Sequence, residues 1–262
     1  MSGNRMTDLA LAELATSISP EITVLELARN KITVLDKKLL EMIIEPNYRL
    51  EWLGIANNHL KETSADAIFL NAKYSKHIMR LDVRNNKLGS GCLESLSNLL
   101  EKTQTLEELY IGGNYFSGRC GERLFKTLAH NKTLRVLDYS LNQLGDESSL
   151  AVAQSIAYCF ENNKTLEHLD LSFNNFSKED SEIISRGLEN NRTLYGLHFR
   201  GNYGYVNAKG FLILSEREGT QLHSVDTFKI DGFKITAPLL PNSIDSHTYR
   251  DVCWVCEGWY EQ

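Results

Sequence analysis

The sequence predicts an α/β solenoid, a curved horseshoe with a parallel β-sheet on its concave face and helices on its convex face. Three observations predict it: one phrase recurs at a fixed period, the phrase alternates like a short strand, and the segments between phrases have helical spacing. A unit of one strand and one helix cannot bury its apolar side alone, so neighbouring units must stack side by side.

The recurring phrase follows the template Leu-x-x-Leu-x-Leu-x-x-Asn-x-apolar, of which LEHLDLSFNNF at residues 166–176 is one copy. Successive template asparagines are 28, 28, 28, 28, 32 and 28 residues apart, so one insertion of four interrupts a constant period. Such regularity indicates a repeated structural unit. The asparagines are Asn30, Asn58, Asn86, Asn114, Asn142, Asn174 and Asn202.

Each phrase has the pattern of a short strand with one buried face. Leu169 and Leu171 alternate with polar neighbours. Where the chain leaves the strand, backbone polar groups would be buried without partners, and an Asn side chain both donates and accepts hydrogen bonds. We therefore expect the stacked asparagines to form a structural ladder.

The segments between phrases predict helices, because residues such as Leu93, Leu96 and Leu100 share one helical face. The four extra residues between Asn142 and Asn174 amount to about one helical turn. We expect them to lengthen a helix on the convex side. The triplets NKT at 131 and 163 and NRT at 191 resemble glycosylation sequons, but they recur because they occupy the same helix-to-strand turn.

This repeat resembles that of the leucine-rich-repeat proteins, and its period is similar to that of the ribonuclease-inhibitor-like class. The resemblance covers roughly residues 22–204. It implies a non-enzymatic scaffold that binds a partner protein on the concave face. Other branches of the class imply two alternatives: an activator of a small GTPase, with Arg84, Asn57 and Asn85 near the strand ends, or a cytoskeletal filament-associated or capping protein.

Both ends of the array are expected to carry atypical units. TDLALAELATSIS, with Thr7 as N-cap, predicts a helix that covers the first strand. LHSVDTFKI keeps the period but has Ile230 at the asparagine position, which indicates a degenerate eighth strand. The predicted divisions are an N-terminal capping helix at 1–21, about seven repeats at 22–220, a degenerate eighth repeat or C-terminal cap at 221–245, and a Trp/Cys-rich tail at 246–262.

The outward positions of the strands supply the candidate binding residues. Trp, Tyr and Arg are enriched among interface hot spots, although outward positions on any repeat protein are polar by default. A Tyr110→Ala change is expected to weaken binding and to leave the melting temperature nearly unchanged. The predicted partner-binding residues are Trp52, Arg80, Asp82, Arg84, Glu108, Tyr110, Asp138, His168, Asp170, His198 and Arg200.

No catalytic residue or cofactor is predicted. The group Asp138, His168, Asp170 and His198 invites an acid/base or metal interpretation, but a cross-strand ion pair between Asp170 and His198 explains it more simply. The chain contains no Walker loop, nucleophile elbow or HExxH motif.

The tail contains CWVCEGW, and its aromatic residues predict docking of Trp254 and Trp259 on the last repeat or on something beyond residue 262. The alternative is a zinc site with Cys253 and Cys256 as ligands and His247 as a third, but no fourth ligand has familiar spacing. We therefore predict no metal site.

Composition sets the class of partner. A net charge of −6 with no Lys/Arg block argues against nucleic acid. The absence of a signal-peptide run or of about 18 consecutive apolar residues argues against membrane insertion. Five irregularly spaced cysteines favour a reducing compartment. The prediction is a cytoplasmic protein whose partner is another protein.

Overall fold

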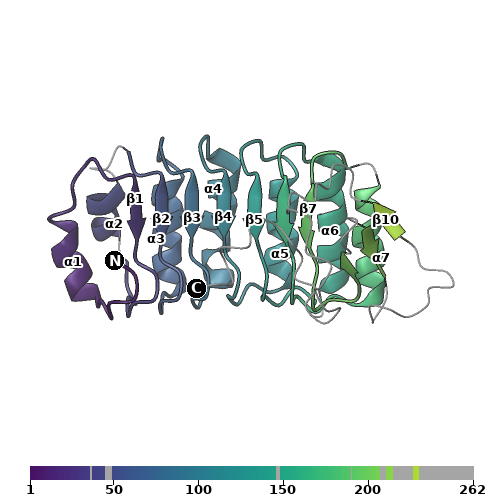
Figure 1. Cartoon of the computed structure of the whole chain (residues 1–262), viewed down its shortest axis with the longest axis horizontal. Helices are drawn as coiled ribbons and strands as arrows, with labels where there is room; N and C mark the ends of the chain where they lie inside the picture. The colour runs from purple at the N-terminus through teal and green to yellow at the C-terminus, as the bar shows by residue number, and fades with distance from the viewer. Residues whose placement is uncertain are drawn as a thin grey trace, which may run out of the picture.

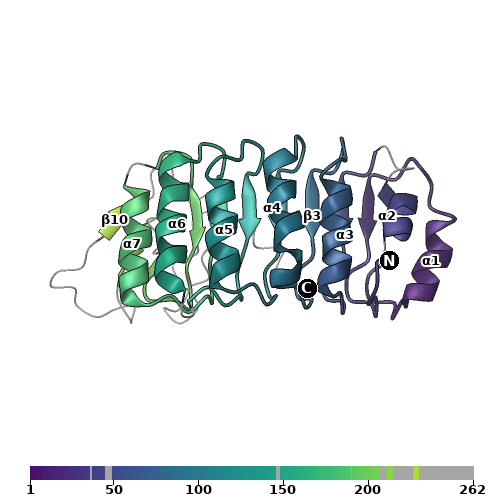
Figure 2. The ribbon, with the colours of Figure 1, turned by 180° about the vertical axis from the view of Figure 1, so that it is seen from behind.

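The molecule consists of two layers, a sheet of short strands and a row of helices behind it (Figures 1 and 2). The computed structural model describes residues 1–35, 37–44, 49–145, 148–189, 191–206, 211–214 and 227–229. Seven parallel strands lie in chain order, which confirms the predicted repeat solenoid. They are β1 (Val24–Glu26), β2 (Trp52–Gly54), β3 (Arg80–Asp82), β4 (Glu108–Tyr110), β5 (Val136–Asp138), β6 (His168–Asp170) and β7 (Gly196–His198).

The helices cover one side of the sheet, as Figure 2 shows from behind. The helix α6, with 14 residues, is longer than α5 and α7, with 11 each, so the inserted residues lengthen a helix as predicted. The helices are α1 (Asp8–Ala15), α2 (Lys37–Ile44), α3 (Glu62–Ala72), the 3-10 turn η1 (Ser90–Cys92), α4 (Leu93–Lys102), α5 (Gly118–Leu128), α6 (Ser149–Asn162) and α7 (Lys178–Leu188).

The central residue of every strand is a buried leucine. These leucines are register partners across all seven strands, so they form one continuous column in the core between sheet and helices. The residues on either side of each leucine point the opposite way and line what we call the sheet face. The column consists of Leu25, Leu53, Leu81, Leu109, Leu137, Leu169 and Leu197.

The template asparagines join successive repeats through hydrogen bonds. Asn58 Nδ2 donates to the carbonyl oxygens of Leu27, at 3.0 Å, and Ile55, at 3.1 Å. Its Oδ1 accepts from the N–H of Ile32 at 3.0 Å. The ladder therefore satisfies backbone groups of two repeats at once, and Asn58 is buried.

A second row of asparagines lies in the helix-to-strand turns. Asn131, Asn163 and Asn191 each donate, at 2.7 Å, to a carbonyl oxygen of the preceding repeat. All three are buried. This contact explains the recurring NKT and NRT triplets by structure.

The first repeat is covered by residues 1–15. Asn30 Oδ1 accepts from the N–H groups of Asn4 and Met6, and Leu11 of α1 is buried in the core. Thr7 holds the N-cap position of α1 without a side-chain cap hydrogen bond. Asp8 instead accepts from the N–H of Thr33 at 2.7 Å, which ties α1 to the first repeat.

The chain leaves the repeat pattern after β7. The strands β8 (Tyr205–Val206), β9 (Phe211–Ile213) and β10 (Thr227–Lys229) form a separate antiparallel sheet. The expected degenerate eighth strand begins at Leu222, in a segment that lies mostly outside the described residues, and its described part, β10, pairs with β9 and not with the seven-stranded sheet. Gly204, with a φ of 106°, starts a hairpin where a convex helix would follow in a regular repeat. The tail at 246–262, with Cys253, Trp254, Cys256 and Trp259, lies outside the described residues.

Candidate partner-binding surface

Two columns of side chains line the sheet face, one on each side of the leucine column. Adjacent strands are about 4.8 Å apart, so neighbours within a column touch. The first column contains Val24, Trp52, Arg80, Glu108, Val136, His168 and Gly196. The second column contains Glu26, Gly54, Asp82, Tyr110, Asp138, Asp170 and His198.

The accessible side chains of the first column lie on β1 to β4, and Val24 on β1 is 57% exposed. The Arg80 guanidinium is 5.6 Å from the ring centre of Trp52, and its Nε is 2.9 Å from Glu108 Oε1. Trp52 and Glu108 are half-buried and Arg80 is exposed. We call these three residues the Trp–Arg–Glu row. Arg200, after β7, is also exposed and lies 5.8 Å from the ring centre of Phe173.

A second network lies directly below this row, around Arg84. Its Nη2 is 2.8 Å and its Nε 3.0 Å from the Asp82 carboxylate, and its Nη1 is 3.7 Å from Asp138 Oδ2. Burial acts to lower the pKa of Arg84, but the bonds from Asp82 and the charge of Asp138 raise it overall. The guanidinium therefore remains charged and holds three strands together.

Tyr110 lies in the same network and is only 4% exposed. Its hydroxyl donates to Glu108, and Arg84 is 5.1 Å from its ring centre. Burial, followed by the bond to Glu108, raises the pKa of Tyr110. The expectation that Tyr110→Ala leaves the melting temperature nearly unchanged is corrected, because the truncation removes a packed ring and a buried hydrogen bond.

The acidic and histidine residues of β5, β6 and β7 are buried between their neighbours. Asp138 and Asp170 each accept from the backbone N–H of the serine two residues later, at 3.0 and 2.8 Å. His168 Nε2 lies 3.0 Å from His198 Nε2, so one ring donates and the other accepts. Asp170 and His198 are register partners, and an ion pair between them stays a prediction.

Burial divides the predicted binding residues into two groups. Trp52, Arg80, Arg84, Glu108 and Arg200 reach the surface of the sheet face. The other six are covered because side chains of neighbouring strands lie in contact, and we expect them to support the face without touching a partner. These six are Asp82, Tyr110, Asp138, His168, Asp170 and His198.

The buried pair Asp138 and Asp170 predicts a pH effect on stability. Burial, with the charge of Asp170 next, raises the pKa of Asp138 from 3.8 to about 6. A raised pKa in the folded state means that the folded protein binds more protons between these values, so its stability falls as the pH rises through about 6. We expect Asp138→Asn to be more stable than wild type at pH 7, by on the order of 1–3 kcal/mol, with a smaller difference at pH 4.

Urea unfolding of both proteins between pH 4 and pH 7.5 measures this difference. Parallel stability profiles would contradict a raised pKa of Asp138.

The described residues contain no cluster of three or more His, Cys, Asp or Glu side chains that could hold a metal ion. Cys92 and Cys159 are buried, and desolvation raises the pKa of each thiol to about 12. A thiol with such a pKa is a poor nucleophile. Neither thiol is therefore a candidate for covalent chemistry.

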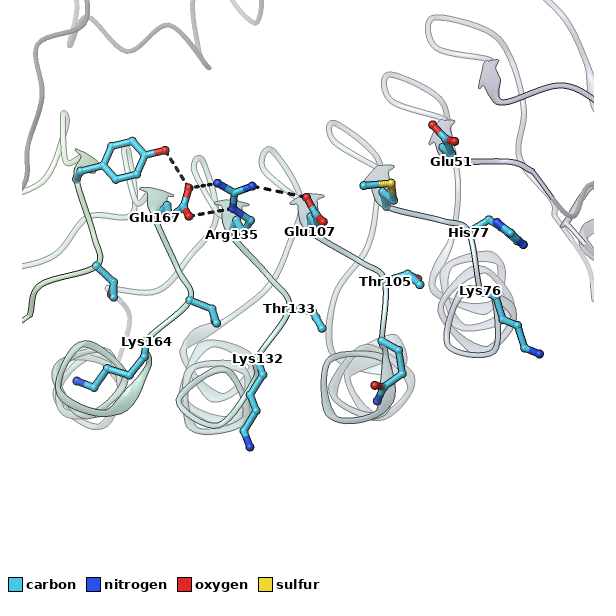
Figure 3. Close-up of a pocket in the computed structure, with 15 residues that line it drawn as sticks. Glu51, Lys76, His77, Thr105, Glu107, Lys132, Thr133, Arg135, Lys164 and Glu167 are labelled. Carbon is cyan, nitrogen blue, oxygen red and sulfur yellow. Dashed lines mark hydrogen bonds and ion pairs between the residues drawn. The ribbon is translucent and has the colours of Figure 1, made fainter.

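A groove of about 780 Å³ runs along the edge where the strands begin (Figure 3). Arg135 forms two hydrogen bonds with Glu167, of 2.9 and 2.7 Å, and lies 3.9 Å from Glu107. Tyr195 donates to Glu167 at 3.0 Å. Partial burial acts to raise the pKa of Glu167, but these bonds lower it overall. Sequence reasoning missed this groove although the NKT and NRT triplets line part of it, because these triplets were interpreted only as structural turns.

Comparisons with known proteins agree with this architecture. Residues 130–153 and 162–180 match the family model described as "Leucine Rich repeat". The ribonuclease inhibitor of Sus scrofa is 31% identical over 134 residues, which cover 50% of this chain and 29% of the inhibitor. The protein "NACHT, LRR and PYD domains-containing protein 14" of Homo sapiens is 31% identical over 109 residues, which cover 41% of this chain and 10% of that protein.

Among solved structures, "Leiomodin-1 Actin-Binding Site 2 (ABS2)" aligns over 68% of this chain and 87% of its own, with 14% identity and a TM-score of 0.44. A likeness of this size does not indicate function.

The stacked strand–helix units and their asparagine ladder make this chain a leucine-rich-repeat protein. Its repeats belong to the ribonuclease-inhibitor-like class. The matched region spans less than a third of either curated relative, at 29% and 10% of their lengths. No helix among the described residues is long and apolar enough to cross a membrane.

Proposed function

We propose that this protein is a non-enzymatic scaffold that binds a partner protein on its sheet face. The observation that carries the proposal is the Trp–Arg–Glu row, which puts an accessible aromatic ring, a guanidinium and a carboxylate side by side. Trp and Arg are enriched at interface hot spots because they combine large contact area with directed donors. The relative named ribonuclease inhibitor, by its name, acts on another protein.

A binding role also suits the energetics of the face. The contacts between Arg80, Trp52 and Glu108 hold these side chains in place before a partner arrives, which lowers the entropy cost of binding. The residues below them, Arg84 and Tyr110, are fixed by hydrogen bonds and packing. The row therefore rests on a rigid support.

The other functions considered from the sequence have less support. For a GTPase activator the sequence offered Arg84, which is bound to Asp82 and Asp138. No observation on the described residues favours filament capping. An acid/base role for His168 and Asp170 would need access to substrate, and both are buried. A cytoplasmic location stays a prediction from the sequence.

The test of the proposal is the double variant Trp52→Ala with Arg80→Ala. We expect it to lose partners that wild type captures from cell extract, as read by mass spectrometry, because truncating a hot spot weakens binding by about 2 kcal/mol or more. Both substitutions lie outside the leucine core, so thermal unfolding should change little.

The matched control changes an aromatic residue and an arginine on the helix side, Tyr158→Ala with Arg123→Ala. It should capture the same proteins as wild type. If the Trp52/Arg80 variant also captures every protein that wild type does, the sheet face is not the binding site.

A further inference from the structure

The turns that follow the seven parallel strands form a second edge of the sheet, opposite the groove of Figure 3. We call it the strand-end edge. In every turn the residue before the ladder asparagine has a φ between 51° and 78°, in the left-handed region. These residues are Arg29, Asn57, Asn85, Gly113, Leu141, Phe173 and Gly201.

Three of these residues, Arg29, Leu141 and Phe173, are neither Asn nor Gly and are unsuited to their backbone conformation. Asn and Gly adopt left-handed φ values readily, whereas a bulky Leu or Phe does so under strain. Leu141 and Phe173 have φ values of 52° and 56° and are 54% and 41% exposed. These side chains therefore add no core packing, and they strain the backbone. Backbone strain of this kind is typical of binding sites.

Leu141 and Phe173 lie on adjacent turns and form the centre of an apolar patch. The N–H of Leu141 donates to the carbonyl oxygen of Ser172 at 2.8 Å, which sets the two turns side by side. Tyr115, on the preceding turn, is 57% exposed. Arg200 lies over the ring of Phe173 and places a positive charge at the rim of the patch.

The other half of the edge is basic. Lys31, His59, Lys61 and Lys87 are exposed, and Lys61 and Lys87 are bridge partners on neighbouring turns. The turns at 27–35, 55–61, 83–90, 111–118, 139–145, 171–177 and 199–206 contain no Asp or Glu, although the whole chain has a net charge of −6.

Two acids of the neighbouring helices, Asp8 and Glu62, lie against this edge. Asp8 accepts hydrogen bonds from Thr33, and Glu62 accepts one from the N–H of Gly91. Arg29, Lys31, Lys61 and Lys87 outnumber these two carboxylates, so this half of the described edge has a positive local charge within an acidic protein.

We propose that the strand-end edge binds an extended acidic segment of a partner protein. Apolar side chains of the segment pack on Tyr115, Leu141 and Phe173, and its carboxylates face Lys61 and Lys87. Five strand spacings separate Arg29 from Phe173, roughly 24 Å, which an extended peptide spans with about seven residues. This inference rests on the proposed function as a protein-binding scaffold and adds a second contact surface with a defined partner chemistry.

The test selects random peptides of about 12 residues, displayed on phage, against the full chain. We expect the enriched peptides to be acidic and to contain Leu, Ile, Phe or Trp, with an affinity that falls as salt is added. Two double variants, Leu141→Asn with Phe173→Asn and Lys61→Gln with Lys87→Gln, should each lower the affinity for these peptides by about tenfold or more. The Asn variant should melt at or above the wild-type temperature, because Asn relieves the left-handed strain.

Matched controls separate the outcomes. Leu150→Asn with Tyr158→Asn, on the helix side, and Lys76→Gln with Lys132→Gln, on the groove edge, should bind the peptides like wild type. Peptides that lack acids, peptides unaffected by both edge variants, or no enrichment would each overturn the inference. If the Trp52/Arg80 variant alone fails to bind the peptides, the inference is also overturned, and the result supports only the sheet-face proposal. A third outcome is that no acidic peptides are enriched and that a single-stranded oligonucleotide binds tightly in a way that depends on Lys61 and Lys87. This outcome would mean that the edge binds a nucleic acid and not a protein.

Discussion

Replacing Asn114 by Ala should lower the free energy of unfolding by about 3–5 kcal/mol, because several buried backbone groups lose their partners together. Asn114 Nδ2 donates to the carbonyl oxygens of Val83, at 3.2 Å, and Ile111, at 2.9 Å. Its Oδ1 accepts from the N–H groups of Asn86, at 3.2 Å, and Leu88, at 3.3 Å. Alanine can replace none of these bonds, and water cannot enter without opening the stack.

Chemical denaturation measures this loss, and Asn98→Ala is the matched control. The Asn98 side chain makes one exposed hydrogen bond, to Glu94 on the same helix, so its removal should change stability by less than about 0.5 kcal/mol. Equal effects of the two changes would mean that the ladder contributes no more than a surface amide.

Replacing Leu169 by Ala should lower the free energy of unfolding by about 2–5 kcal/mol through a cavity in the leucine column. Leu169 is fully buried on β6 and is the register partner of Leu137 and Leu197. In a stack of repeats each unit is stabilised by its two neighbours, so the damage should spread to the adjacent units. Hydrogen exchange should become faster from β5 to β7 before it does at β2 and β3.

Leu150→Ala serves as control for this change because Leu150 is 55% exposed on α6. Its free energy of unfolding should remain within about 0.5 kcal/mol of wild type. If Leu169→Ala were as mild, the leucine column would not be the core of the stack.

The repeats were predictable because their signal is periodic and local. An asparagine every 28 residues at most intervals, with apolar alternation before it, specifies both the strand and its ladder in each copy. The chain beyond β7 was less predictable. Its apolar spacing continues, but Gly204 starts an antiparallel hairpin, and the partner of β9 is chosen by contacts that no period describes.

For the candidate site, the sequence predicted which side of the sheet the residues occupy but not which of them are accessible. The period assigned Trp52, Arg80 and Tyr110 to the outward positions, but accessibility depends on the side chain of the next strand. Arg80 lies over the ring of Trp52 and pairs with Glu108 but stays exposed, whereas Tyr110 is covered by Arg84 and Glu108. The exposed Leu141 and Phe173 escaped notice because the template places no requirement on the position before the asparagine.

The 28-residue period is enough to predict a leucine-rich-repeat solenoid with seven parallel strands, because each unit buries its apolar side only against its two neighbours. The period does not specify which outward side chains reach solvent in the folded protein. That choice depends on contacts between residues of neighbouring repeats, about 28 positions apart in the chain and about 4.8 Å apart across the sheet. The charged and the strained residues of the turns form continuous surfaces only because the fold places the turns side by side.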